Sequence, residues 1–347
     1  MRELQQLLDD FLAANDAMPG VLLHVDAPSR GVSWSGSAGV IERGGGLLDP
    51  GACFRTASVT KTFVATSILR LADQGRLALD DSVLAHLPDR AATMLAAHSP
   101  DAGSITLRQV LRHTSGIYDF GTDDRYRRTI ALEPAKVWSA DDLIGLAFEQ
   151  GTPYCPPGQE FHYSDTGYVL LALVLEQQTG LGFAAALRHL ADLDGIGLAH
   201  TWLEGKEPPP NGAPPRVHQY MGADDTFTWD PSFDGYGGGG LVSTTADLAR
   251  FLRAVIVGDV LSPESRAAMQ DTCVPTPFGL VGQRHGLGLF ETSSNGIRRL
   301  GHEGFWGVWM YHFPDHDVTV GGVHTALPFD VASKERLVEG PARLLAP

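Results

Sequence analysis

The sequence lacks any long apolar run. No stretch approaches the roughly 20 consecutive apolar residues that a membrane-spanning helix needs, and the first 12 residues form an amphipathic pattern that contains acidic side chains. A signal peptide would instead carry a positively charged start followed by an apolar core. We therefore expect a cytoplasmic protein that does not act on a membrane, or a secreted one if a leader has been removed.

The chain also lacks an excess of basic residues. Lysine and arginine number 26 against 41 aspartates and glutamates, which gives a formal net charge of −15 at pH 7. Such a charge disfavours binding to nucleic acid or to an anionic membrane surface. We expect no nucleic-acid partner, although the charge excludes little else because many soluble enzymes are acidic.

Cysteine is scarce. The three cysteines are Cys53, Cys155 and Cys273, an odd number at spacings that match neither a disulfide framework nor a metal site. Buried and reduced thiols are the simplest interpretation, and we expect no bound metal.

What the sequence does contain is enough apolar material for a large core. The 347 residues are 43% hydrophobic and 19% charged, and a chain of this length forms one large domain or two closely packed ones. The 40 glycines and 22 prolines are spread along the chain and indicate many turns and structured loops. Because neither an internal repeat nor a low-complexity linker is visible, we expect a single domain over residues 1–347.

Strand patterns occur at both ends of the chain, with helical patterns between them. Predicted strands cover residues 20–26, 31–40, 51–56, 284–291, 297–300, 305–313 and 318–325. Predicted helices cover residues 2–15, 107–112, 140–149, 164–178, 183–192, 244–257, 263–271 and 332–345. The economical architecture is α+β: an antiparallel sheet region formed by residues 1–57 and 275–347, flanked by the N- and C-terminal helices, with a helical region inserted at about 76–200.

The segment 54–63 predicts the entry to a helix, with Ser58 and Lys61 one turn apart on the same face. A serine hydroxyl becomes a good nucleophile when a base lies within hydrogen-bond reach, and a lysine in a dry site can have its pKa lowered enough to help. The helix start also directs backbone N–H groups toward an oxyanion that forms over Ser58. By itself, however, a Ser-x-x-Lys pattern occurs by chance on many surface helices.

Tyr163 lies just before the buried helix predicted for residues 164–178. A tyrosine at that position can face a cleft, where a neighbouring lysine cation would lower its pKa and let it act as a base. The alternative is that Tyr163 only packs, while Ser164 or Asp165 caps the helix.

The glycine-rich segment 301–307 lies between two predicted strands. An edge strand that passes a serine can donate a backbone N–H to an oxyanion, and Gly304 would let a substrate approach closely. His302 and Glu303 do not begin a zinc-binding His-Glu-x-x-His pattern, because Trp306 stands where the second histidine is needed. The alternative for His302 is an ordinary hydrogen-bonded strand residue.

A further segment, residues 111–119, has the pattern of a helix exit with a glycine stop, and we interpret it as structural. Aromatic residues near these segments favour a partly apolar pocket, although most aromatic side chains in any protein belong to its core. They are Tyr118, Phe120, Trp229, Tyr236, Phe305 and Trp306.

Together these segments resemble the three motifs of the serine β-lactamase and penicillin-binding-protein superfamily. The motifs are, in order, Ser58-Val59-Thr60-Lys61, Tyr163-Ser164-Asp165 and His302-Glu303-Gly304. The chain is most similar to the class C β-lactamase-like branch, which contains D-aminopeptidases, DD-carboxypeptidase-like enzymes, esterases and acyltransferases. The similarity extends from about residue 20 to 325, and it includes accessory segments at His113–Gly116, Pro157-Gly158 and Gly238–Thr244.

This resemblance implies a role for each matching residue. Ser58 would be the acylated nucleophile, and Lys61 would hold the proton network. Tyr163 would take the Ser58 proton and return it to the leaving group. The backbone N–H groups of Ser58 and Phe305 would form the oxyanion hole. Asp165 stands where the family more often has the asparagine that orients the lysine and the substrate.

Two positions depart from the family pattern. Asp165 adds a negative charge, which either pairs with Lys61 and raises its pKa or recognises a cation on the substrate. His302 replaces the lysine that β-lactamases use against the substrate carboxylate, and a neutral imidazole holds a carboxylate less well. Because the His-x-Gly form is closer to the D-aminopeptidase and esterase members, we do not expect efficient β-lactamase activity.

The sequence therefore predicts a serine hydrolase that acylates Ser58 with a small ester or amide and lets water resolve the acyl-enzyme, without a cofactor. Substrate contacts are expected from Gly304, Phe305, Trp306 and Tyr118. Two alternatives remain open: an acyltransferase that uses the same acyl-enzyme, and a non-catalytic binding protein with this fold. The formation of a homo-oligomer also remains open.

Overall fold

The computed structural model describes residues 1–277, 279, 282–294 and 296–346. Its main sheet has eight strands in the order β2-β1-β13-β12-β11-β10-β9-β8, and neighbouring strands are antiparallel. These strands are β1 (Gly20–Ala27), β2 (Val32–Gly39), β8 (Val274–Pro275), β9 (Arg284–His285), β10 (Phe290–Ser294), β11 (Ile297–Gly304), β12 (Val308–Phe313) and β13 (Val318–His324).

Two small sheets accompany the main one, in the orders β14-β5-β6 and β3-β7-β4. Their strands are β3 (Phe54–Arg55), β4 (Trp202–Leu203), β5 (Tyr220–Met221), β6 (Asp224–Asp225), β7 (Leu241–Ser243) and β14 (Ala326–Leu327). The second small sheet has a direct bearing on function, because β3 leads into the turn that carries Ser58.

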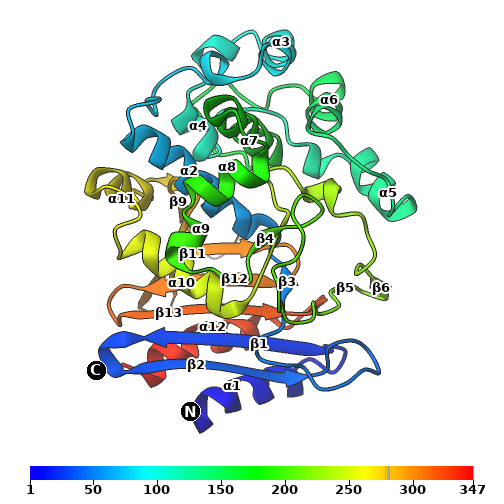
Figure 1. Cartoon of the computed structure of the whole chain (residues 1–347), viewed down its shortest axis with the longest axis vertical. Coiled ribbons are helices and arrows are strands. Elements are labelled where there is room, and N and C mark those ends of the chain that lie inside the picture. Colours follow the sequence, from blue (N-terminus) through cyan, green and yellow to red (C-terminus); the bar gives the residue numbers. More distant parts are fainter. Residues whose placement is uncertain (278, 280–281, 295, 347) are drawn as a thin grey trace.

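Helices account for most of the remaining regular structure. They are α1 (Arg2–Ala13), α2 (Thr60–Asp73), α3 (Asp89–His98), α4 (Leu107–Leu111), α5 (Asp124–Leu132), α6 (Ala140–Gln150), α7 (Asp165–Thr179), α8 (Phe183–Leu190), α9 (Leu193–Ile196), α10 (Thr245–Ile256), α11 (Pro263–Gln270) and α12 (Val331–Leu344). Figure 1 shows α3 to α8 gathered at one end of the molecule, beyond the sheet.

The two faces of the sheet are covered by different helices because side chains alternate along each strand. In β1, Val21 and Leu23 pack in the apolar cluster that contains residues of α1 and α12. Leu22, between them, packs in the other cluster, which contains residues of α2, α7 and α10. The strand is buried on both faces, so its sequence is nearly continuously apolar.

The N-terminal strands pair with a C-terminal one. In the register of β1 with β13, Val21 lies opposite His324 and Asp26 lies opposite Thr319. Figure 1 shows the blue strands β1 and β2 next to the orange strand β13. This arrangement confirms the predicted α+β class, an antiparallel sheet flanked by the terminal helices with a helical region inserted between its strands.

Helix α7 forms where the sequence predicted it, and its ends explain why. The Ser164 side chain caps the helix by accepting the N–H of Gly167 at 3.1 Å, and Gly180 ends it in the left-handed conformation with φ of 70°. Ten consecutive residues of the helix, from Thr166 to Leu175, are buried.

Several predicted strands have different bounds. The strand predicted over residues 51–56 is reduced to β3, Phe54–Arg55. The strand predicted over residues 284–291 is two strands, β9 and β10, and Gly288 between them has φ of 70°. Strand β11 continues past residue 300 to Gly304, and β12 begins at Val308 rather than at residue 305. Gly301 is part of the strand, and a Cβ there would lie 1.9 Å from the Met310 carbonyl oxygen.

Strand β11 is not the edge strand that we predicted, because β10 and β12 pair on its two sides. The β10 pairing reaches only from Ile297 to Gly301. Residues 302–304 pair with β12 alone, so the last three residues of β11 form a local edge, and this edge faces the turn that carries Ser58.

Among the residues described, no single helix has the length and apolar composition that would let it span a membrane; α7 and α8 satisfy the test together but are bent by 82° at the break between them.

Candidate active site

Ser58 lies in a short 3-10 turn, Ala57–Val59, between β3 and α2. Ala57 has a positive φ of 46°, a conformation that side chains other than glycine adopt at a cost of about 1–3 kcal/mol. Ala57 and Val59 are buried, whereas Ser58 is partly exposed. The turn therefore presents the hydroxyl to solvent at the start of a buried helix.

Lys61 is fully buried and connects three parts of the chain. Its Nζ donates to Ser58 Oγ at 3.0 Å and to the Gly238 carbonyl oxygen at 2.6 Å, and it lies 2.5 Å from Asp165 Oδ1. Burial by itself lowers the pKa of Lys61, but the negative charges around it, Asp165 foremost, outweigh burial and hold the pKa above its usual range. Lys61 is therefore an ammonium ion at neutral pH. The structure selects the first alternative for Asp165, an ion pair with Lys61.

Tyr163 hydrogen-bonds to the side chains of both Ser58 and Lys61. Its ring centroid lies 5.0 Å from Lys61 Nζ. The structure thus brings Ser58, Lys61, Tyr163 and Asp165 together, although they come from the turn before α2, from α2 itself and from the start of α7. Ser164 caps α7 while Tyr163 hydrogen-bonds to the serine, so the predicted capping role of this segment and the predicted catalytic position of Tyr163 both fit the structure.

The protonation of Tyr163 differs from our expectation. We expected the lysine cation to lower the pKa of Tyr163. Burial of the phenol raises the pKa to about 12, with a further contribution from Asp165, and the opposing effect of Lys61 is smaller. The expectation omitted burial, which a sequence pattern does not reveal. Tyr163 is therefore a neutral phenol near pH 7.

The segment around Gly304 packs directly on the turn that carries Ser58. A Cβ at position 304 would lie 2.2 Å from the Thr56 carbonyl oxygen. The close approach at Gly304 is thus made by the protein backbone, whereas we had expected a substrate to make it. Phe305 follows β11 and its side chain is 57% exposed. Within the described part of the chain, its backbone N–H donates to no acceptor, so this N–H remains free for an oxyanion.

Trp306 lies beneath the same turn. It is buried and forms edge-to-face contacts with Trp229 and Phe233, at centroid distances of 6.3 Å and 6.1 Å. Together with Ala57 and Asp234 it lines a narrow pocket of about 10 Å³, which is room for one water-sized group. Of the six aromatic residues named from the sequence, Trp306 lines this pocket, which also contains the charged residues Arg55, Glu204 and Asp234.

His302 is buried behind the site. Its Nδ1 lies 2.7 Å from the Glu303 carbonyl oxygen, to which it donates as the neutral imidazole. Burial, reinforced by the nearby Lys61 charge, lowers the pKa of His302 to about 3. His302 therefore presents no positive charge to a substrate carboxylate.

In the described portion of the structure, Tyr118 does not contact the other residues predicted for the site. Its ring lies 5.3 Å from that of Tyr154, and its hydroxyl lies 3.4 Å from Asp123 Oδ2. None of the contacts that the structure describes for Tyr118 involves Ser58.

Three residues of the site were missed by the sequence analysis. The His113 ring stacks on Tyr163 at a centroid distance of 4.2 Å, and its Nδ1 accepts the Ser164 N–H at 3.1 Å. Asp119 and Asp234 lie close enough to the Lys61 and Asp165 charges to interact with them. His113 and Asp119 both belong to the segment 111–119 that we interpreted as structural, and the signal available was its resemblance to an accessory motif of the family.

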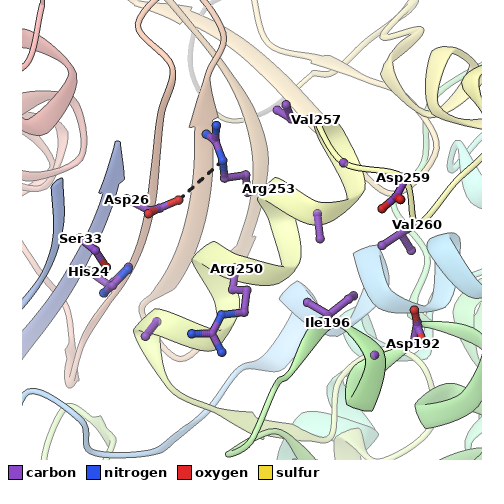
Figure 2. Close-up of a pocket in the computed structure, with 14 residues that line it drawn as sticks. His24, Asp26, Ser33, Asp192, Ile196, Arg250, Arg253, Val257, Asp259 and Val260 are labelled. Carbon is purple, nitrogen blue, oxygen red and sulfur yellow. Dashed lines mark ion pairs between the residues drawn. The ribbon is translucent and has the colours of Figure 1, made fainter. Parts of the chain in front are cut away.

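A much larger pocket, of about 450 Å³, lies elsewhere in the molecule, between α10 and the strands β1 and β2. Figure 2 shows Arg250 and Arg253 entering it from α10, opposite His24 and Asp26. Arg253 is paired with Asp317 at 2.7 Å and lies 3.7 Å from Asp26. Because the chain's own carboxylates already engage this guanidinium, we assign the pocket no ligand.

Comparison with known proteins identifies the class to which this arrangement belongs. The chain matches the Beta-lactamase family over residues 4–340, nearly its whole length, and therefore belongs to that family. This result confirms the superfamily that the motifs resembled and supports a hydrolase of the serine type.

The relatives include penicillin-binding proteins. Penicillin-binding protein 4* of Bacillus subtilis (strain 168) is 26% identical over 294 residues, which are 79% of this chain and 60% of that protein. Penicillin-binding protein 4 of Amycolatopsis lactamdurans is 29% identical over 298 residues, covering 77% of this chain and 70% of that protein. The chain thus spans about two thirds of the length of these relatives.

Solved structures of amidases match the chain over almost their full length. A D-stereospecific amidohydrolase from Streptomyces sp. has a TM-score of 0.84 at 26% identity and covers 98% of both chains. The D-amino acid amidase from Ochrobactrum anthropi SV3, in complex with L-phenylalanine amide, has a TM-score of 0.82 at 25% identity and covers 99% of this chain and 96% of that chain.

Proposed function

We propose that this protein is a serine hydrolase that forms an acyl-enzyme on Ser58 and hydrolyses an ester or an amide. The observation that carries the proposal is the contact of one partly exposed serine hydroxyl with both a buried ammonium and a phenol. Such a contact provides a nucleophile, a fixed positive charge and a proton carrier at one point.

Acylation begins with attack of Ser58 Oγ on the substrate carbonyl carbon. The Ser58 proton passes to the Tyr163 oxygen while the Tyr163 proton passes to the leaving amine or alcohol. Tyr163 is neutral before and after the step, so a neutral phenol performs this transfer without first losing its proton. Lys61 remains an ammonium throughout and stabilises negative charge that develops on the two oxygens.

The same proton path operates in reverse for deacylation. Water attacks the acyl carbonyl, gives its proton to Tyr163, and the Tyr163 proton returns to Ser58 Oγ. In both steps the oxyanion accepts hydrogen bonds from the backbone N–H groups of Ser58 and Phe305. A small change in the position of Phe305 would then lower the rate, because such donors act only at short range.

D-amino acid amides are the first substrate class to test. Of the two solved enzymes named above, one is named a D-amino acid amidase and the other a D-stereospecific amidohydrolase, and both match nearly the whole chain. Lys61 is paired with Asp165 at 2.5 Å, and His302 is neutral. Neither Lys61 nor His302 therefore offers an unpaired positive charge to a substrate carboxylate of the kind that a β-lactam carries.

The test is a set of rate measurements with a matched variant. The wild-type protein, Ser58→Ala and the exposed-serine control Ser104→Ala are assayed with p-nitrophenyl acetate, D- and L-phenylalanine amide, and a penicillin. We expect Ser58→Ala to lose at least about 10³-fold in kcat/KM and Ser104→Ala to lose none. Retention of full activity by Ser58→Ala would refute the proposal. Products formed in the presence of an added amine decide between hydrolysis and acyl transfer.

A further inference from the structure

The loop at residues 119–121 is linked to the start of α7 by two hydrogen bonds. Asp119 Oδ1 accepts the backbone N–H of Asp165 at 2.9 Å, and it also accepts the N–H of Gly121 at 3.0 Å. In the opposite direction, the Phe120 N–H donates to Thr166 Oγ1 at 3.1 Å. The loop and the first turn of the helix therefore hold each other in one relative position.

The same loop also contacts the side chain of Asp165. A Cβ at position 121 would lie 2.6 Å from Asp165 Oδ2, so any larger residue there would have to displace this carboxylate. The other oxygen of Asp165 lies 2.5 Å from Lys61 Nζ. Asp165 is thus fixed at its backbone by Asp119 and at its carboxylate between Gly121 and Lys61.

Helix capping explains part of the role of Asp119, because its side chain caps the 3-10 turn Phe120–Thr122 by accepting the Gly121 N–H, but it is not the cap of α7. The cap of α7 is already supplied by Ser164, and Asp119 is a buried carboxylate with 3% exposure. Burial and the neighbouring Asp165 charge raise the pKa of Asp119 to about 7. The other charged or titratable groups that face it are Lys61 on α2 and the Tyr126 phenol on α5. A buried negative charge at this position is unfavourable for stability. The hydrogen bond from the Asp165 amide to Asp119 is therefore the better explanation for a carboxylate here.

We propose that Asp119 is a positioning residue of the active site, which accepts the Asp165 N–H and thereby holds Asp165 against Lys61 and Tyr163 against Ser58. The inference rests on the proposed function of Ser58 and extends it to a residue that touches neither the serine nor the lysine by hydrogen bond. Its acceptor oxygen is the essential feature, and its charge is secondary.

Three variants separate this role from a general structural one. Asp119→Asn keeps an acceptor oxygen of the same shape, whereas Asp119→Ala removes it. Thr166→Val is the matched control, because it breaks the other hydrogen bond between the same two segments and leaves the Asp165 N–H bonded. For each variant, kcat and KM are measured per active site titrated with a fluorophosphonate, and hydrogen exchange of the Asp165 amide is followed by NMR.

We expect Asp119→Ala to lower kcat by about 10- to 100-fold while KM changes less than about threefold, and to speed exchange of the Asp165 amide. Asp119→Asn should restore most of kcat and the slow exchange, and Thr166→Val should lose stability without a comparable loss of kcat. Wild-type kcat and exchange in Asp119→Ala would overturn the inference, as would an equal loss in Thr166→Val.

If the wild-type protein neither reacts with the fluorophosphonate nor turns over any substrate, the proposed function fails. Exchange of the Asp165 amide then tests the role of Asp119 independently of activity. Faster exchange in Asp119→Ala but not in Thr166→Val would support the contact of Asp119 with α7, and unchanged exchange would refute it.

Discussion

Asp165 changes the number of protons that the site holds. With an asparagine at this position, Lys61 would lose its nearest counter-ion, which would favour a phenolate at Tyr163. With the carboxylate present, the ammonium is paired at 2.5 Å and Tyr163 keeps its proton. The carboxylate thus favours the protonated phenol, and in the proposed mechanism Tyr163 transfers protons instead of serving as a preformed base.

Replacing Asp165 by asparagine should reverse this effect. Asp165 raises the pKa of both Tyr163 and Lys61, so Asp165→Asn should lower the pKa of Tyr163 from about 12. In a profile of kcat/KM against pH, the limb that reports this phenol should move to lower pH. The exposed Asp124→Asn is a suitable control, and a limb that stays in place in Asp165→Asn would contradict this description of the network.

That these four residues lie together could be predicted from the sequence, whereas their ionisation could not. Ser58, Lys61, Tyr163 and Asp165 stand in motifs with fixed order, and the structure brings them together. The pKa of Tyr163 depends on how much of the ring is covered, and that depends on His113 and other residues distant in sequence. The role of Asp119 was not predicted, because its hydrogen bond to the Asp165 amide joins segments 46 residues apart in sequence.

At the scale of elements, the site depends on the contact between the end of β11 and the turn Ala57–Val59. The last three residues of β11 pair only with β12, which leaves their other side to the turn. Gly304 permits this contact, because any side chain would collide with the Thr56 carbonyl oxygen at 2.2 Å. The position of the Phe305 N–H relative to Ser58 is set by this contact.

Gly304→Ala should therefore separate the two halves of the oxyanion hole. The added methyl group must displace backbone, so we expect a loss of about 1–3 kcal/mol in the free energy of unfolding and at least about tenfold in kcat. Gly103→Ala is the control, because no atom lies within 4 Å of the Cβ that it would add. Denaturant titration and initial rates measure the two effects, and a Gly304→Ala protein with wild-type kcat would contradict the assignment of Phe305.

The strands at both ends of the chain were predictable from their alternating or continuous apolar patterns. The extent of β11 was not, because its glycines have a packing role. Gly301 lies against the Met310 carbonyl oxygen and Gly304 against that of Thr56. A glycine required by a close backbone contact has the same appearance in a sequence as a glycine required by a turn.

At the scale of the whole molecule, the site joins segments that are distant in sequence. The nucleophile comes from the junction of β3 and α2, the phenol and carboxylate from the start of α7, a carbonyl from residue 238, and the oxyanion donor from the end of β11. These segments meet between the sheet and the helical end of the molecule, which Figure 1 shows beyond β11. The site therefore exists only in the complete fold.

The fold should lose stability in mild acid. Six histidines are buried with lowered pKa, in each case chiefly because of burial: His24, His113, His285, His302, His312 and His324. Below a pH of about 6.5, these imidazoles become protonated in the unfolded chain but stay neutral in the folded protein, so the free energy of unfolding decreases as the pH falls. Asp119 and Asp234, with pKa raised to about 7, act in the opposite direction over the same range, but they are fewer.

We therefore expect a net loss of several kcal/mol between pH 7 and pH 5, since each buried histidine contributes about 2 kcal/mol at pH 5. Chemical unfolding at a series of pH values measures this loss. His312→Gln, which removes one such group far from Ser58 along the sheet, should give a shallower dependence. Equal or greater stability at pH 5 would show that these imidazoles are not held neutral by the fold.

The most direct test of the central claim is the intact mass of the protein, quenched during reaction with a D-amino acid amide or a p-nitrophenyl ester. We predict a mass increase equal to one acyl group, located on the peptide that contains Ser58 and absent from Ser58→Ala. Turnover without any such adduct, or an adduct that persists in Ser58→Ala, would contradict an acyl-enzyme on this serine.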